Sequence, residues 1–306
     1  MSDTKNQATE FPIEVEQLSR SFGAKQALND VTLKVPRGCV FGLLGESGAG
    51  KTTVMRHLLG LMKPQSGSVR VVGRDPVLDP EAVLSQIGYL SEDRDMPGWM
   101  RVRELMRYTE GFYPDWDQGY ADELIHRFDL IVEQKVRTLS RGQMAKTGLV
   151  TALAHRPDLL ILDEPSSGLD VVVRRHILDA VMRTVAGEGR TVLFSSHLMD
   201  EVEAVSDYVA ILHRGNLVLC DTLDTIRGMH RKVTVEFNEA QEHGPKIDGV
   251  LLWQGRGTHW FALSTGDGAA IQEAQAAHGF RILEDGVPSL EDIFVARIAD
   301  EPLENI

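Results

Sequence analysis

A glycine-rich segment between an apolar run and a helical pattern constrains the fold of this chain more than any other feature. The segment reads GESGAGKT from Gly45 to Thr52, and it follows the nearly continuous apolar run 39–44. Glycines at these positions let successive backbone N–H groups close around a phosphate, and a helix that starts there adds its positive end. The succession of strand, turn and helix predicts the start of a parallel α/β layer.

Individual residues of this loop, and of the end of a second apolar run, are expected to bind a nucleoside triphosphate. We expect Lys51 to reach the β- and γ-phosphate oxygens and the Thr52 hydroxyl to bind Mg²⁺. The apolar run 159–162 ends in Asp163, expected to support the metal, and Glu164, expected to hold the attacking water. A strand that ends in two acids is often only a strand that meets solvent. The functional interpretation of Asp163 and Glu164 therefore depends on the presence of the phosphate loop at 45–52.

A third motif starts a later apolar helix. Ser140 and Gln143 form a capping box at its expected N-terminus, and Gly142 leaves the backbone there bare. A helix start of this kind is either a plain cap or a second anion site. Because the phosphate loop of the same chain does not need a second anion site, the second interpretation predicts another subunit.

Five motifs in this order resemble those of the ATP-binding cassette (ABC) ATPases, over roughly residues 13–225. They are the segments 45–52, 139–143, 159–164 and 167–170, and His197. The resemblance implies an α/β P-loop NTPase of ABC type, with an antiparallel β subdomain, a mainly parallel core sheet, a helical subdomain and a small C-terminal α/β domain. It also implies a head-to-tail dimer, in which the segment 139–143, the family signature, closes over the γ-phosphate held by the partner's loop.

The same resemblance implies roles for individual residues. Glu164 would orient or deprotonate the attacking water, and Lys51 and His197 would contact the γ-phosphate. Asp170 would lie at the dimer interface. The residues implied to bind nucleotide are Phe22, by stacking on adenine, and Gly45, Glu46, Ser47, Gly48, Ala49, Gly50, Lys51, Thr52, Thr53, Ser140, Gly142, Gln143 and Asp170. Those implied to bind the metal are Thr52, Asp163 and Glu92. An ordinary core phenylalanine is the alternative for Phe22, and a surface histidine is the alternative for His197.

Two positions depart from the family pattern. Glu92 stands where the family commonly has Gln; its carboxylate can face Mg²⁺, but it adds negative charge near the phosphates. Arg141 stands where Gly is usual, and at a helix start it opposes the dipole slightly while it can assist an anion. Neither departure removes the lysine or the glutamate of the site, so we expect active hydrolysis.

The pattern divides the chain into three parts. Residues 1–12 are expected to form a flexible N-terminus, and residues 13–227 the ATPase domain, with a helical subdomain at about 84–150. Residues 228–306 are expected to form a small accessory α/β domain. Its predicted elements are strands at 232–237, 250–254 and 258–263 and a helix near 269–278.

Charge and composition narrow the function. The 306 residues carry 32 Lys and Arg against 45 Asp and Glu, and the net charge of −13 argues against a nucleic-acid partner. No apolar run approaches the ~20 residues that cross a bilayer, and the polar N-terminus lacks the apolar core of a signal peptide. We therefore expect a cytoplasmic protein with two buried thiols, Cys39 and Cys220.

The C-terminal tail, with the segment 289–294, is similar to that of ATPases that serve bacterial drug, antibiotic, lipid and polysaccharide exporters. This resemblance implies ATP and Mg²⁺ as ligands, a second ATPase subunit in a homodimer, and a separate membrane permease that holds the chain on the cytoplasmic face of the membrane. A coupling segment of the permease is expected against residues 92–103. The segment 111–117 either resembles a subgroup encoded near GntR-type regulators or is an aromatic turn.

Two alternatives stay open. One is a soluble cassette ATPase of nucleic-acid, cluster-assembly or division machinery. The other is a catalytically weak regulatory cassette, to which Glu92 and Arg141 point.

Overall fold

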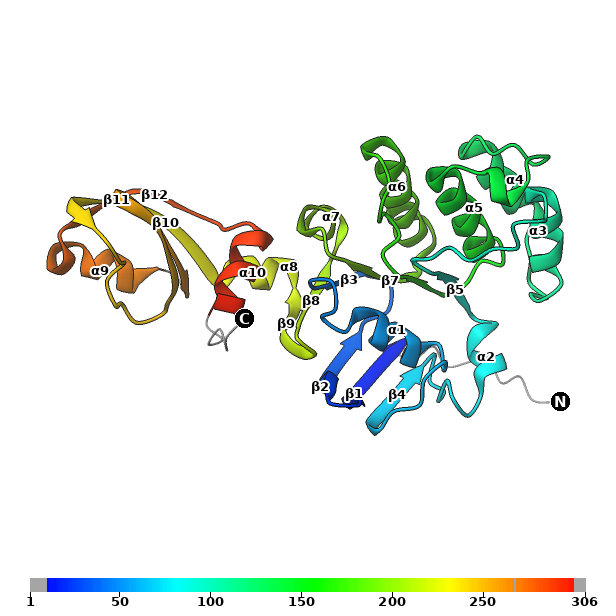
Figure 1. Cartoon of the computed structure of the whole chain (residues 1–306), viewed down its shortest axis with the longest axis horizontal. Helices are drawn as coiled ribbons and strands as arrows, with labels where there is room; N and C mark the ends of the chain where they lie inside the picture. Colours follow the sequence, from blue (N-terminus) through cyan, green and yellow to red (C-terminus); the bar gives the residue numbers. More distant parts are fainter. Residues whose placement is uncertain (1–9, 267, 300–306) are drawn as a thin grey trace. The chain divides into compact units, whose positions relative to one another are not determined.

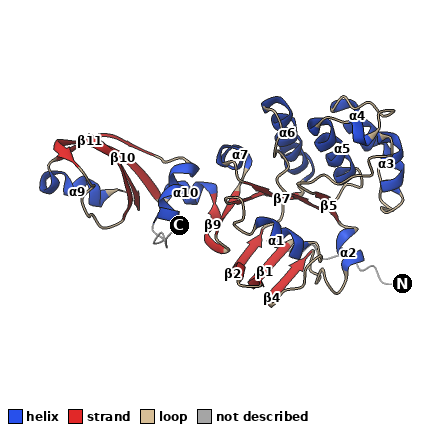
Figure 2. Cartoon of the chain, viewed as in Figure 1, coloured by secondary structure: helices blue, strands red, loops and turns tan. Residues whose placement is uncertain are grey.

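The computed structural model describes residues 10–266 and 268–299, and the chain divides into two compact units, Met1–Cys220 and Asp221–Ile306 (Figure 1). In the described residues, the first unit holds a six-stranded and a three-stranded sheet, and the second holds another three-stranded sheet (Figure 2). This division falls a few residues before the predicted boundary at 227. The segment 1–12, expected to be flexible, lies largely outside the described residues.

The six-stranded sheet forms the centre of the first unit. Its strands are β3 (Val40–Leu44), β5 (Ile87–Leu90), β6 (Leu159–Leu162), β7 (Thr191–Ser196), β8 (Tyr208–His213) and β9 (Asn216–Thr222). They lie in the order β5-β6-β7-β3-β8-β9, and the neighbours from β5 to β8 are parallel. Every residue of β3, β6 and β7 is buried, which explains the continuous apolar sequences of β3 and β6 and the apolar centre of β7, residues 192–194. The predicted parallel core sheet is confirmed.

The carboxyl ends of these strands bring distant segments together. Leu44, the last residue of β3, pairs with Ser196, the last residue of β7, and β6 pairs with β7 in parallel. The segments that begin at Gly45, Asp163 and His197 therefore leave the sheet along one edge. Ligands of open parallel sheets bind at this edge.

A three-stranded antiparallel sheet belongs to the same unit. Its strands β1 (Ile13–Phe22), β2 (Lys25–Val35) and β4 (Ser66–Val71) lie in the order β2-β1-β4. The helix α1 (Lys51–Leu58) buries its apolar face in a hydrophobic core that contains residues of both sheets. The alternation of apolar and polar residues in β1 and β2 predicted this antiparallel subdomain, which is confirmed.

Helices make up the rest of the first unit. They are α2 (Pro80–Leu84), α3 (Val102–Glu110), α4 (Gln118–Arg127), the 3-10 helix η1 (Val136–Thr138), α5 (Arg141–Leu153), α6 (Val171–Glu188) and α7 (Met199–Val205). Both α3 and α4 pack against α5 (Figure 1). The expected helical range 84–150 also contains β5, a four-residue strand too short for its apolar pattern to show its type. Within residues 10–266 and 268–299, no helix is long and apolar enough to span a bilayer.

The second unit is an antiparallel sheet with helices. Its elements are α8 (Leu223–Gly228), β10 (His230–Gln241), β11 (Val250–Thr265), α9 (Ala269–His278), β12 (Phe280–Gly286) and α10 (Leu290–Ala299). The strands lie in the order β11-β10-β12, and Val235, Phe237 and Trp260 belong to their hydrophobic core. The helix expected near 269–278 is present.

Two sequence-based expectations were wrong in detail, and one strand was missed. The single strand β11 replaces the two strands predicted at 250–254 and 258–263, because Gly255 and Gly257 interrupt the apolar pattern but not the strand. The strand β12 was not predicted, since Arg281, Glu284 and Asp285 interrupt its apolar pattern. Cys39 is buried as expected, but Cys220 is exposed, because it lies on the edge strand β9.

Candidate functional site

The loop between β3 and α1 takes a conformation that requires its glycines. Gly50 is the N-cap of α1 with φ 115°, and a Cβ there would lie 2.7 Å from the Ala27 carbonyl oxygen. A Cβ on Gly45 would lie 2.4 Å from the Leu212 carbonyl oxygen. The glycines of the motif therefore permit both a left-handed backbone and close packing against neighbouring strands.

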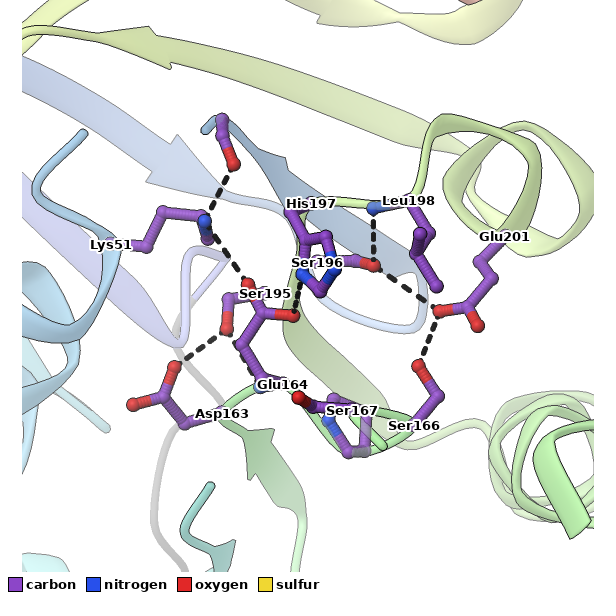
Figure 3. Close-up of polar contacts among 12 residues, drawn as sticks. Lys51, Asp163, Glu164, Ser166, Ser167, Ser195, Ser196, His197, Leu198 and Glu201 are labelled. Atoms are coloured by element: carbon purple, nitrogen blue, oxygen red, sulfur yellow. Dashed lines mark hydrogen bonds and ion pairs between the residues drawn. The ribbon is translucent and has the colours of Figure 1, made fainter. Parts of the chain in front are cut away.

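Lys51, the first residue of α1, is 6% exposed and turns back toward the loop. Its Nζ donates to the carbonyl oxygens of Gly45 at 2.6 Å and Glu46 at 3.2 Å. The same Nζ lies 3.0 Å from Glu164 Oε1, so the ammonium group is paired with a carboxylate (Figure 3). The structure thus brings the lysine and the carboxylate of two separate motifs into direct contact.

Glu164 connects Lys51 to His197. Its Oε2 lies 2.7 Å from His197 Nδ1, and since a carboxylate only accepts, Nδ1 carries the proton of this hydrogen bond. The Glu164 backbone N–H donates to Ser195 Oγ at 2.9 Å, and its φ is 47°, an uncommon value for a side-chain-bearing residue. Such conformations persist only where surrounding contacts hold them, and they cluster at functional sites.

Asp163 is almost completely buried beside the loop. Ser195 Oγ donates to its Oδ1 at 2.7 Å, and the Thr52 hydroxyl also bonds to its carboxylate. Burial raises the pKa of Asp163, while the hydrogen bonds from Ser195 and Thr52 act in the opposite direction. The two residues predicted from different motifs to bind Mg²⁺ are therefore hydrogen-bonded neighbours.

Ser195 was missed by sequence reasoning, although its hydroxyl donates to the Asp163 carboxylate and accepts from the Glu164 backbone N–H. It lies near the end of the buried strand β7, next to a second serine. Two hydroxyl side chains that directly follow the apolar residues 192–194 of this buried strand were the available signal, because buried polar groups need partners.

A cavity of about 410 Å³ gathers most of the predicted residues. It is lined by Phe22, Lys25, Ala27, Ser47, Gly48, Gly50, Lys51, Thr52, Thr53, Glu92, Glu164, Ser167 and His197. Phe22 is 45% exposed, and the Arg20 guanidinium lies 5.1 Å from its ring centroid, so the alternative of a core phenylalanine is wrong. Partial burial raises the pKa of Glu92, and the charges of Asp163 and Glu164 raise it further.

The 139–143 segment forms the predicted capping box. Gln143 N–H donates to Ser140 Oγ at 3.2 Å, and Ser140 N–H donates to Gln143 Oε1 at 2.9 Å. A Cβ on Gly142 would lie 2.9 Å from Val173 Cγ2, so this glycine lets α5 approach α6 closely. The side chain of Arg141 lies against Gly168.

The signature residues and Asp170 are not part of the cavity that Lys51 lines, among the residues that the structure describes. Asp170 instead caps α6 locally, because its Oδ1 accepts from the N–H groups of Val172 and Val173, each at 3.0 Å. These hydrogen bonds lower the pKa of Asp170. One chain therefore assembles the phosphate loop, the acids and His197, but leaves the signature elsewhere.

Arg94 is a second residue that sequence reasoning missed. Its buried guanidinium donates to the carbonyl oxygens of Pro165 and Ser167, each at 3.0 Å. It thereby ties the segment that carries Glu92 to the segment that follows Glu164. No local pattern reveals this contact, because the partners are backbone atoms of a distant segment.

Comparisons with known proteins decide the family. A family model described as ABC transporter matches residues 28–167. The uncharacterized ABC transporter ATP-binding protein YhaQ of Bacillus subtilis is 33% identical over 303 residues, which cover 93% of this chain and 97% of that protein. The chain belongs to the ABC transporter family. Membership confirms the family resemblance and the activity expected from the sequence. The chain is an ATP-binding subunit of an ABC transporter and an ATP hydrolase.

Other relatives and solved structures agree with this assignment. The daunorubicin resistance ATP-binding protein DrrA3 of Streptomyces coeruleorubidus is 33% identical over 250 residues, 80% of this ABC chain and 75% of the relative. A solved ATP binding subunit of an ABC transporter is 31% identical, with a TM-score of 0.65 over 70% of this chain and 91% of that one. A dimeric cassette bound to ADP and Pi shares the fold at 21% identity and a TM-score of 0.62, over 69% and 98% of the two chains.

Proposed function

We propose that this ABC ATPase binds ATP with Mg²⁺ in the cavity at Lys51, and that two copies close around two nucleotides to drive export through a separate membrane permease. The observation that carries the proposal is the contact chain Lys51–Glu164–His197 at this cavity. The signature lies outside the same cavity, and a second copy would supply it. A two-fold pair would complete both sites at once.

The residues at Thr52 and Asp163 fit Mg²⁺. Hydroxyl and carboxylate oxygens are the ligands this ion prefers, and here they come from two elements and already touch. Ser195 Oγ also donates a hydrogen bond to the Asp163 carboxylate. Glu92 supplies a further oxygen on the cavity wall. When bound, Mg²⁺ neutralises charge on the phosphates.

The contacts of Lys51 and Glu164 suggest how the chain's own residues act. Phosphate oxygens compete with Glu164 for the Lys51 ammonium, because both are anionic acceptors at the same donor. Glu164, once released from Lys51, holds the attacking water and accepts its proton, while His197 keeps the carboxylate oriented. The remaining catalysis is positioning and charge stabilisation, as is general for phosphoryl transfer.

A groove on the first unit, outside the segment 92–103 expected from the sequence, is our proposed permease-docking surface. It has a volume of about 720 Å³ and is lined by Asp79, Glu81, Ala82, Leu84, Ser85, Thr109, Phe112, Tyr113 and Pro114. Phe112 is 62% exposed, while Tyr113 stacks on His155 with ring centroids 3.8 Å apart and so holds the segment 111–117 in place. An exposed aromatic ring beside Glu81 suits a short cytoplasmic helix that presents apolar residues and a basic residue, whereas Asp79 on the same wall is already paired with Arg74.

The test of this function is copurification. The neighbouring reading frame is first checked for a polytopic membrane protein with about six hydrophobic spans; such a protein is coexpressed with the chain, and the complex is isolated from detergent-solubilised membranes. We expect a stable complex whose ATPase activity requires Mg²⁺. ATPase activity that is stimulated by nucleic acid, without any membrane partner, would favour the non-transport alternative.

A further inference from the structure

A buried carboxylate behind the site has no part in the chemistry proposed above. Glu201, on α7, is 2% exposed. Its Oε2 accepts hydrogen bonds from Ser166 Oγ at 2.5 Å and from Ser196 Oγ at 3.2 Å, and its Oε1 lies 2.9 Å from Arg174 Nε (Figure 3). One side chain thus receives contacts from three other segments of the chain.

Two of these segments carry functional residues of the site. Ser166 follows Glu164 by two positions, and its carbonyl oxygen accepts from the Leu169 N–H at 3.2 Å. Ser196 directly precedes His197, and its hydroxyl accepts from the Leu198 N–H at 3.0 Å while it donates to the carboxylate. Figure 3 shows the Glu201 carboxylate reaching both serines, on the far side of His197 and Glu164 from Lys51.

Loss of any of the contacts of Glu201 is energetically costly because its carboxylate is buried. A buried carboxylate without partners is costly, so a shift of either serine away from Glu201 is opposed. Arg174 compensates the charge but comes from α6 and leaves the two serines as the link between the loops. The position of one loop therefore constrains the position of the other through the Glu201 carboxylate.

We propose that Glu201 is a positioning residue that holds the Ser166–Asp170 segment and His197 in a fixed relation to Glu164, so that both loops are set together for hydrolysis. The inference rests on the roles proposed above for Glu164 and His197. It assigns to Glu201 no contact with ATP or water. Its effect is expected on turnover and not on nucleotide binding.

The first test compares Glu201→Gln with the wild-type chain in steady-state ATPase assays with Mg²⁺. The amide keeps the size but has lost the charge that Arg174 and both serines contact, and we expect kcat to fall about tenfold or more, with KM changed less than about twofold. Glu201→Asp retains the charge, and we expect it to recover part of kcat. Asp200→Asn removes an exposed carboxylate from the same helix and is the matched control, with unchanged kcat expected.

A second test uses the serines, and it also serves should Glu201→Gln fail to fold. If Glu201 acts through the two serines, Ser196→Ala alone lowers kcat while Glu201 is present. The double variant Ser166→Ala with Ser196→Ala then loses less kcat than the product of the two single losses. A double variant whose loss of kcat equals the product of the two single losses overturns the proposal. So does a folded Glu201→Gln chain with normal kcat, or one whose ATP affinity falls by the same factor as kcat.

Failure of this inference is distinguishable from failure of the proposed function. Glu164→Gln is assayed beside the other variants. If Glu164→Gln is inactive and Glu201→Gln is normal, only the positioning role is wrong. If Glu164→Gln keeps its turnover, the proposed role of Glu164 as base is wrong, and the positioning role of Glu201, which rests on it, is rejected as well.

Discussion

Lys51 Nζ lies 3.0 Å from Glu164 Oε1, and both side chains are almost completely buried. Neither charge would be stable there alone, because an isolated buried charge is costly. His197 contacts the other oxygen of the same carboxylate. The phosphate-binding lysine, the candidate base and the histidine therefore form one connected unit, and a change in any of them affects the other two.

The first prediction concerns Glu164→Gln. The amide keeps the size of the side chain and removes the anion that competes with phosphate for Lys51, so ATP affinity stays equal or rises. Turnover falls by about 100-fold or more, because the neutral amide accepts no proton from water. Phosphate release measures turnover, and gel filtration with ATP is expected to show an accumulated dimer. Retained turnover would remove Glu164 from the role of base.

The second prediction concerns Lys51→Ala. The variant loses a charged donor to the phosphates, and we expect ATP affinity to fall about tenfold or more. Lys25 lines the same cavity but is exposed, so Lys25→Ala is the matched control and should weaken binding much less. Equilibrium titration with a fluorescent ATP analogue compares the two. An unchanged affinity of Lys51→Ala would show that the phosphate loop is misassigned.

The third prediction concerns Phe22. Its exposed ring at the cavity is expected to stack on adenine, and loss of a base-stacking ring costs about 1–3 kcal/mol. Phe22→Ala should therefore weaken ATP binding about tenfold, whereas Phe22→Tyr keeps it. Binding of inorganic triphosphate, which has no base, should be the same in all three proteins. Equal weakening of both ligands would argue for a change in the loop instead.

The fourth prediction concerns pH. Burial lowers the pKa of His155 from 6.5 to about 4. Between these values the unfolded chain binds more protons than the folded one, so the free energy of unfolding is fully maintained above about pH 6.5 and falls as the pH decreases toward 4. His155→Phe keeps an aromatic ring against Tyr113 and should flatten this dependence. Thermal midpoints from pH 7.5 to 4.5 measure it, and an equal slope in the variant would assign the effect to other groups.

The fifth prediction concerns the docking groove. Leu84→Glu and Phe112→Asp place charge on its apolar part, and both side chains are exposed, so the fold should tolerate the changes. We expect the variants to lose copurification with the permease and to keep the ATPase activity of the isolated chain. Ile131→Asp, an equally exposed apolar position outside this groove, is the control. A complex that survives both groove variants would place the permease elsewhere.

The two units differ in how well local pattern predicted them. Strands β3 and β6 were recognised because both of their faces are buried, so their residues are apolar or glycine, and β7 was recognised from its apolar centre at residues 192–194. Strand β12 was missed because it is exposed at several positions and reads as polar sequence. Cys220 was expected to be buried because it lies in strand-like sequence, whereas the order of the strands places β9 at an edge of the sheet.

The sequence by itself determined the phosphate loop, the pair of acids and the helix caps, because each depends on residues within a few positions of one another. Only the tertiary structure decided that Ser195, Arg94 and Glu201 support the site. Their partners lie on other strands and loops, and the parallel register of β6, β7 and β3 is what brings those segments to one edge of the sheet. Contacts of this kind follow from how buried polar groups are satisfied after the chain has packed, and no local pattern carries that information.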